Sequence, residues 1–131
     1  MGQPLPHVQE ADLEAVGVPR RIRLSRAKGW RLPENTVVVS RPTKWGNPFV
    51  VGKDGDRKEC TTLFAHMLNG YLCVVCTPGI EGQRSYRKFL SRNLHRLRGK
   101  NLACWCALPK SGERDHCHAA VLLQIANRPT P

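Results

Sequence analysis

The stretch Asn101-Leu-Ala-Cys104-Trp-Cys106, separated by a ten-residue loop from Cys117-His118-Ala-Ala-Val-Leu-Leu, decides the fold of this chain. A short apolar run that ends in Cys-x-Cys predicts a strand over residues 101–106, and apolar periodicity predicts a helix over 117–127. Side chains alternate along a strand, so Cys104 and Cys106 are expected on the same face. The pattern therefore predicts that three thiols and one imidazole converge at one end of a strand-loop-helix unit.

Three chemistries fit this Cys/His cluster. Zinc would take Cys104, Cys106, Cys117 and His118 as a closed Cys₃His site that stabilises the fold. Alternatively, Cys106 or Cys117 would be a nucleophile, with His118 or His116 as its base. In the third interpretation the helix start beside Arg114 forms an anion pocket and the thiols only pack. The spacing is irregular for a zinc signature, and all three interpretations stay open.

The segment Arg41-Pro-Thr-Lys-Trp-Gly-Asn-Pro-Phe49 follows a predicted buried strand over 36–40, at the edge of a sheet where ligands commonly bind. Its glycine permits close approach of a ligand, its polar groups suit phosphates and base edges, and its tryptophan can stack. The predicted substrate-binding residues are Arg41, Lys44, Trp45, Gly46 and Asn47. The alternative is a rigid turn in which Trp45 and Phe49 belong to the core and Asn47 bonds its own backbone.

Basic residues outnumber acidic ones by 21 to 10, which gives a formal net charge of +11. The excess is concentrated in residues 16–33 and 82–100, neither of which contains an acid. Such blocks favour polyanions such as nucleic acid or nucleotide phosphates, although charge that only keeps the protein in solution is the alternative. A helix predicted over 83–98 has one basic face, whose predicted nucleic-acid contacts are Arg84, Arg87, Lys88, Arg92 and Arg96.

The remaining patterns predict one α/β domain over residues 19–128, a small sheet flanked by about three helices. Residues 1–18 are expected to be a loose arm with a short helical turn at 10–16, and 129–131 a tail. Strands over 21–25 and 36–40 are expected to form the sheet nucleus. A helix over 60–72 would be capped by Thr61 or Thr62. Cys73-Val-Val-Cys76 has the Cys-x-x-Cys spacing of redox and metal sites, but its apolar neighbours favour small buried residues for Cys73 and Cys76, as for Cys60.

No apolar run reaches the length of about 18 residues that spans a bilayer, and the N-terminal residues lack the apolar core of a secretory signal. The sequence therefore predicts a cytoplasmic protein with no membrane partner. In that compartment its six cysteines would stay reduced.

The segment 41–49, together with Leu102-Ala-Cys-Trp-Cys106 and Cys117-His-Ala-Ala-Val-Leu122, resembles the bacterial and phage family labelled domain of unknown function 4326. The resemblance covers residues 21–127, and the loop between the two cysteine motifs is expanded here relative to the family. The Cys-then-Cys-His layout is also similar to domain of unknown function 488, which favours a shared pocket over a zinc-finger use. Occurrence in phage genomes implies work near nucleic acid or nucleotides.

Two functions are expected from these patterns. The first is an enzyme that acts on a nucleotide, nucleobase or nucleic acid, with Cys106, Cys117 and His118 as catalytic residues. The second is a non-catalytic, zinc-stabilised nucleic-acid-binding module, in which Cys104, Cys106, Cys117 and His118 hold the metal. Metal content separates them, because only the module requires a protected Cys₃His set.

Overall fold

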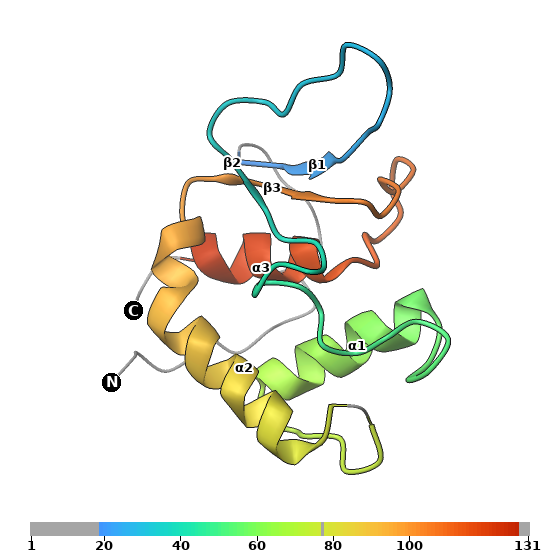
Figure 1. The fold of residues 1–131 in the computed structure, drawn as a ribbon, viewed down its shortest axis with the longest axis vertical. Helices are drawn as coiled ribbons and strands as arrows, with labels where there is room; N and C mark the ends of the chain where they lie inside the picture. Colours follow the sequence, from blue (N-terminus) through green and yellow to red (C-terminus); the bar gives the residue numbers. More distant parts are fainter. Residues whose placement is uncertain (1–18, 77, 129–131) are drawn as a thin grey trace.

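The computed structural model describes residues 19–76 and 78–128. The expected N-terminal arm at 1–18, with its helical turn at 10–16, and the expected tail at 129–131 lie outside the described residues. The described part is an α/β fold with a three-stranded sheet and three helices, which confirms the predicted fold class (Figure 1). Among the described helices, none is both long and apolar enough to cross a membrane.

The sheet is built around the last strand of the chain. Strands β1 (Arg21–Arg23) and β2 (Thr36–Val38) each pair in parallel with β3 (Asn101–Cys104), in the order β1-β3-β2. The prediction that the first two strands form the nucleus is wrong, because they do not contact each other as a pair and both are edge strands. Edge position also leaves β2 only partly buried, whereas β3 is the predominantly buried strand.

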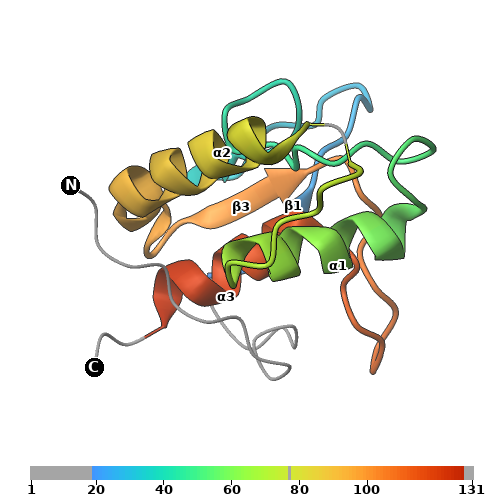
Figure 2. The ribbon, with the colours of Figure 1, turned by 90° about the horizontal axis from the view of Figure 1, so that it is seen from below.

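Helix α3 (His118–Asn127) lies at the centre of the molecule, between the sheet and α1 (Figures 1 and 2). The expected amphipathic helix is instead buried on nearly every side: Val121 and Leu122 are fully buried, and Ile125 is 2% exposed. The reason is that β1, β3, α1 and the short 3₁₀ helix η2 all pack around it. A helix that is apolar all round belongs in an interior position.

The first helix begins earlier than the sequence predicts. Helix α1 (Arg57–Leu68) has Asp56 as its N-cap, and a capping box joins the Asp56 carboxylate to the Glu59 backbone N–H and the Glu59 side chain to the Asp56 N–H. Thr61 and Thr62 are not caps, because their hydroxyls donate to the carbonyls of the residues four positions earlier, inside the helix. Phe64 and Met67 on its inner face are fully buried.

Replacing Asp56 with alanine tests this cap. We expect the free energy of unfolding to fall by about 1 kcal/mol, because the Glu59 backbone N–H at the helix start loses its side-chain acceptor. Urea denaturation followed by circular dichroism measures the change. The matched control is Thr62→Ala. The exposed Thr62 hydroxyl donates to a carbonyl within the helix, so its loss should lower the free energy of unfolding less than Asp56→Ala does. Equal effects of the two substitutions would contradict the capping role.

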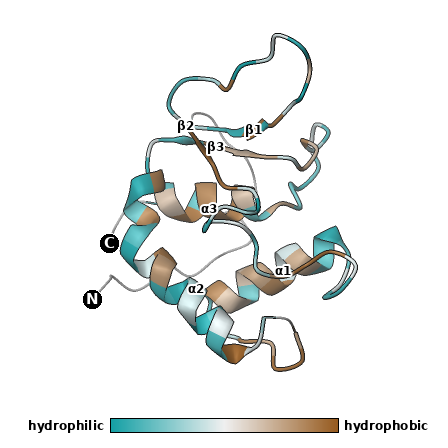
Figure 3. Ribbon diagram, viewed as in Figure 1, coloured by the Kyte–Doolittle hydropathy of each residue, from teal (hydrophilic) through white to brown (hydrophobic). Residues whose placement is uncertain are grey.

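The basic helix is shorter than predicted and continues as a tighter turn. Helix α2 (Ile80–Asn93) passes directly into η2 (Leu94–Leu97), and Leu90 and Leu97 are fully buried beneath them. Gly99 follows in a left-handed conformation with a φ of 76°, in keeping with the expected stop. Figure 3 shows mainly hydrophilic residues along α2 and mainly hydrophobic ones along α3.

The Cys73-Val-Val-Cys76 segment corrects a prediction. Cys73 and Cys76 form a disulfide and are only partly buried, so the predictions that they are small buried residues and that all six cysteines are reduced are wrong. The chain turns sharply here, so that the two Cα atoms lie 5.5 Å apart, and the intervening Val74 and Val75 are exposed. The amide of the buried Gln83 holds one side of the turn, since it bonds both backbone groups of Cys73. Cys60 is a free, buried cysteine, as predicted.

Candidate metal centre

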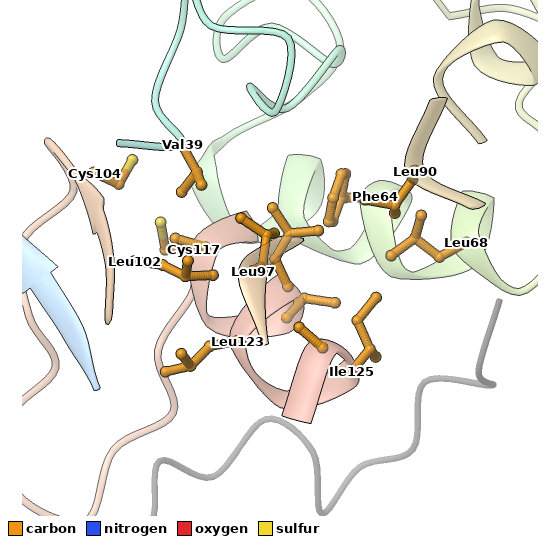
Figure 4. Packing of buried hydrophobic residues seen from close by; sticks show 14 of the residues in the cluster. Val39, Phe64, Leu68, Leu90, Leu97, Leu102, Cys104, Cys117, Leu123 and Ile125 are labelled. Carbon is orange, nitrogen blue, oxygen red and sulfur yellow. The ribbon is translucent and has the colours of Figure 1, made fainter. Parts of the chain in front are cut away.

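Three buried donors meet where β3 ends and α3 begins. Cys104 is the last residue of β3, Cys117 is the N-cap of α3 and His118 is its first residue. One ligand atom from each lies within 4.8 Å of the others, and all three residues are at most 5% exposed. Figure 4 shows the sulfurs of Cys104 and Cys117 in the space between the strand and the helix. This group could hold a metal ion.

Cys106 lies beside this three-donor group but is not a member of it. Its Sγ lies 3.9 Å from the Sγ of Cys104, and its side chain is only partly buried. The strand ends at Cys104, so Cys106 stands on a bend and not on the predicted continuation of the strand. The two thiols are close to each other, as predicted. They are brought together by this bend and not by the alternation of side chains along a strand.

His118 is oriented by the loop that follows β2. Its Nε2 lies 2.7 Å from the carbonyl oxygen of Val39, and its Nδ1 lies 3.9 Å from the Sγ of Cys117. A carbonyl only accepts, so Nε2 carries the proton and Nδ1 keeps its lone pair on the side of the thiols. Burial lowers the pKa of His118, which favours the neutral ring that binds metals. A ligand histidine held by a backbone carbonyl is a common arrangement in metal sites.

The thiols interact strongly with one another. Hydrogen bonds from Cys106 and then Cys117, together with the nearby Arg21 guanidinium, lower the pKa of Cys104 against the effect of burial. The pKa of Cys117 is raised, because its proton is held by Cys104 and Cys106 and because it is buried. The apposed thiols thus favour one thiolate at Cys104 and oppose a second one.

The spacing of the donors suits a tetrahedral ion. With Zn–S bonds of about 2.3 Å, two sulfurs on one zinc lie about 3.8 Å apart, close to the 3.9 Å between Cys104 and Cys106. Thiolates and a neutral imidazole are the donors that zinc prefers. His116 does not belong to the three-donor group, and its backbone carbonyl accepts a hydrogen bond from Arg57.

A buried ion pair closes the loop that carries the cluster. Arg21 of β1 pairs with Asp115, and its guanidinium also donates to the carbonyl oxygens of Cys106 and Ala107. Arg57 of α1 reaches the same loop, 3.7 Å from the second oxygen of Asp115 and 3.0 Å from the Ala107 carbonyl. Burial raises the pKa of Asp115, against the lowering effect of Arg21.

Sequence reasoning missed this pair. Arg21 and Asp115 lie 94 residues apart, and both are nearly fully buried. Their local sequence contexts look like an exposed basic strand and a polar loop. Only their burial distinguishes them, and no periodicity in the sequence reports it. Arg21 of this pair also donates to the Cys106 carbonyl, and this hydrogen bond holds the bend on which Cys106 stands.

The loop predicted to bind substrate starts at this site, but its larger side chains point into the protein. Trp45 packs edge-on against Phe89 of α2, and its carbonyl accepts from the Tyr86 hydroxyl. Asn47 accepts from the Phe49 N–H and donates to the Cys60 carbonyl, while Phe49 is buried. These contacts are those of the rigid-turn alternative.

The other residues of that loop divide between packing and exposure. A Cβ on Gly46 would lie 2.9 Å from the Cγ of Arg41, so Gly46 is needed for the loop to fold against itself. Arg41 and Lys44 are exposed. Their role in binding a substrate stays a prediction.

The basic residues of the second block are mostly at the surface. Arg84, Lys88 and Arg92 are exposed and recur every fourth residue along α2, which places them on one face. Arg96 is exposed on η2, whereas Arg87 is partly buried. A guanidinium nitrogen of Arg84 lies 3.4 Å from a carboxylate oxygen of Glu81, the residue that precedes the acid-free block. Glu81 therefore balances part of the charge of Arg84.

Comparison of the chain with curated proteins and with solved structures gives no match. A family model does match residues 22–128, a span that contains the loop at 41–49, the strand with Cys104, and the helix with Cys117 and His118 at its start. The match covers most of the chain and confirms the expected resemblance. The chain therefore belongs to the family described as Domain of unknown function (DUF4326).

Proposed function

We propose that this chain is a nucleic-acid-binding module whose fold is stabilised by zinc at Cys104, Cys106, Cys117 and His118. The supporting observation is that soft donors converge here. The ligand atoms of Cys104, Cys117 and His118 lie within 4.8 Å of one another, and the Sγ of Cys106 lies 3.9 Å from the Sγ of Cys104. Four protein ligands fill a tetrahedral zinc completely, as in structural sites. The ion would join the end of β3 to the start of α3, the two central elements of the fold.

Burial favours this function over catalysis by the same residues. A nucleophilic thiol must reach its substrate, yet Cys117 is 1% and Cys104 5% exposed. His118 is also buried, and its Nε2 is occupied by the Val39 carbonyl. Cys106 is the most accessible of the three thiols, so an enzyme acting on a nucleotide or nucleobase would have to use Cys106 as its reactive group.

The charge of the chain supports a polyanionic partner. The formal net charge is +11. Arg84, Lys88 and Arg92 form an exposed row of positive charges along one face of α2. Neutralising phosphates with such cations releases bound counterions, which supplies most of the affinity of non-specific nucleic-acid binding. Four of the six cysteines are free thiols, as a reducing cytoplasm would keep them, whereas the Cys73–Cys76 disulfide does not favour that compartment. A cytoplasmic location stays part of this proposal because of the four free thiols.

Metal analysis of the purified protein tests the first half of this proposal. Elemental analysis should find about one zinc per chain, with the cluster thiols protected from a thiol reagent until a chelator is added. A metal-free protein with one thiol that reacts rapidly at neutral pH would overturn the zinc site and favour the enzyme.

Salt-dependent binding tests the second half. We expect the triple variant Arg84→Ala/Lys88→Ala/Arg92→Ala to bind duplex DNA more weakly and to lower the slope of log affinity against log salt by about two to three, since each phosphate contact contributes about 0.9. Fluorescence anisotropy of a labelled duplex over a range of salt concentrations measures both quantities.

The matched control is Lys53→Ala/Lys58→Ala/Lys110→Ala, which removes the same charge at exposed positions outside α2. It should leave the slope almost unchanged. Equal slopes for the two triple variants would show that α2 is not the contact surface. If the unaltered protein shows no binding at low salt, nucleic acid is not its partner.

A further inference from the structure

A second site lies beside the metal cluster, on residues that the proposed function does not use. Arg23, Leu24, Ser25, Arg26 and Trp105 line an open pocket of about 520 Å³. Pockets of about 300–1,000 Å³ accommodate ligands of nucleotide size. No acid lines this pocket, and two of its five residues are arginines.

Trp105 is the central feature of the pocket. Its side chain is 45% exposed, although it stands directly between the buried Cys104 and the partly buried Cys106. The guanidinium carbon of Arg26 lies 4.8 Å from the centroid of the indole ring, a cation–π contact that holds the ring and places a positive charge beside it. An exposed indole next to guanidinium groups combines a surface for stacking with partners for phosphate.

The position of this pocket is coupled to the metal cluster. Arg23 lies opposite Cys104 in the pairing of β1 with β3, and the Leu24 N–H donates to the Cys104 carbonyl at 2.9 Å. One wall of the pocket is therefore hydrogen-bonded to a metal-ligand residue. Trp105 is bounded on both sides by such residues, so a filled metal site would hold the indole ring in place for binding.

We propose that this pocket binds one nucleotide of a single strand, with the base stacked on the face of Trp105 opposite Arg26 and the phosphate held by Arg23 and Arg26. Stacking requires an unpaired base, because a base inside a duplex has no free face. The ligand chemistry is a base with an attached phosphate, which a strand or a free mononucleotide can supply. This inference deepens the proposed nucleic-acid function and rests on it, and it assigns a separate contact surface from α2.

The test compares Trp105→Ala with Trp30→Ala in the full, zinc-loaded chain. Trp30 is the matched control, because it is an exposed tryptophan that does not line the pocket. The probes are a 12-nucleotide single strand, a 12-base-pair duplex and adenosine monophosphate. Loss of the indole should weaken single-strand binding by about 5- to 100-fold, as expected for one stacked base, without changing the salt slope. Duplex binding should stay within twofold, and Trp30→Ala should behave as the unaltered protein.

Two further variants keep the result interpretable if the Trp105→Ala protein folds poorly. Trp105→Phe retains an aromatic surface and should recover most of the single-strand affinity. Arg23→Ala/Arg26→Ala retains the Trp105 side chain but removes its cation–π contact with Arg26, and it should lower the single-strand salt slope by about one to two. Zinc content and circular dichroism establish that each variant is folded. Binding of adenosine monophosphate that also depends on Trp105 would identify a free nucleotide as the ligand source.

Three outcomes overturn the inference, and they are distinguishable from failure of the proposed function. If Trp105→Ala and Trp30→Ala bind the single strand equally, the pocket is not the site. If Trp105→Ala weakens duplex and single-strand binding alike, the indole has a general structural effect and does not stack on a base. If the unaltered protein binds duplex but neither the single strand nor the mononucleotide, the proposed function stands and this inference fails.

Discussion

Replacing Cys117 with serine is expected to abolish the proposed zinc binding and to cause a large loss of stability. Cys117 is 1% exposed and lies among the donors of Cys104, Cys106 and His118, where a hydroxyl is a poor substitute for a thiolate ligand. A site occupied at a free metal concentration about a thousandfold above its dissociation constant stabilises the folded state by about 4 kcal/mol. The variant should lose this contribution, because its ligand set is incomplete.

The measurement combines elemental analysis with urea denaturation, with and without added zinc. Cys60→Ser is the matched control: Cys60 is also free and buried, and its thiol contacts the Gly55 carbonyl instead of the cluster. The control should retain about one zinc per chain even if it is somewhat less stable. If Cys117→Ser does not fold, chelation of the unaltered protein provides the same comparison. Retention of a full equivalent of zinc by Cys117→Ser would contradict the proposed ligand set.

Replacing Arg21 with methionine is expected to lower the free energy of unfolding by about 3–5 kcal/mol, the usual cost of breaking a buried ion pair from one side. Asp115 would remain buried without its closest cation, and the carbonyls of Cys106 and Ala107 would each lose a donor. Arg57, at 3.7 Å from Asp115, compensates only in part, since its own side chain is 41% exposed.

The double variant Arg21→Met/Asp115→Leu separates the ion pair from the other effects. It should recover a large part of the lost stability, because well-packed apolar groups commonly replace a buried pair at little cost. Arg57→Ala is the control for removing one arginine from the same loop, and we expect it to cost about 1 kcal/mol. Urea denaturation of the unaltered protein, Arg21→Met, Asp115→Leu and the double variant completes the cycle. An Arg21→Met protein as stable as Arg57→Ala would falsify the assignment of Arg21 as the principal partner of Asp115.

The amino-acid sequence was sufficient to predict the convergence of the donors. Cys104 at the end of an apolar run and Cys117-His118 at the start of another could be recognised, because strand and helix formation depend on local periodicity. The family resemblance was also legible, because it lies in these same short motifs. The bend that carries Cys106 was not predicted, since it depends on Arg21 holding the Cys106 carbonyl.

Two other features have local sequence patterns that admit more than one interpretation. The Asp56-x-x-Glu59 pattern is the local signal of the capping box, although the two threonines that follow it are also common N-cap residues. The disulfide between Cys73 and Cys76 agrees with the redox interpretation of Cys-x-x-Cys, but the same four residues also suit a buried helix end. The turn that joins the two sulfurs is held by Gln83. The pocket around Trp105 likewise required β1 to pair with β3.

The sequence by itself determined the α/β class, the basic character of the chain, the family and the Cys/His set at the junction of a strand and a helix. Each is encoded by composition or by residues close together in the chain. Only the tertiary structure decided that β3 is the central strand, that α3 is buried on nearly every side, and that Arg21 and Asp115 form a pair. These features arise from burial and from contacts across 65 to 94 residues, which depend on how the whole core packs.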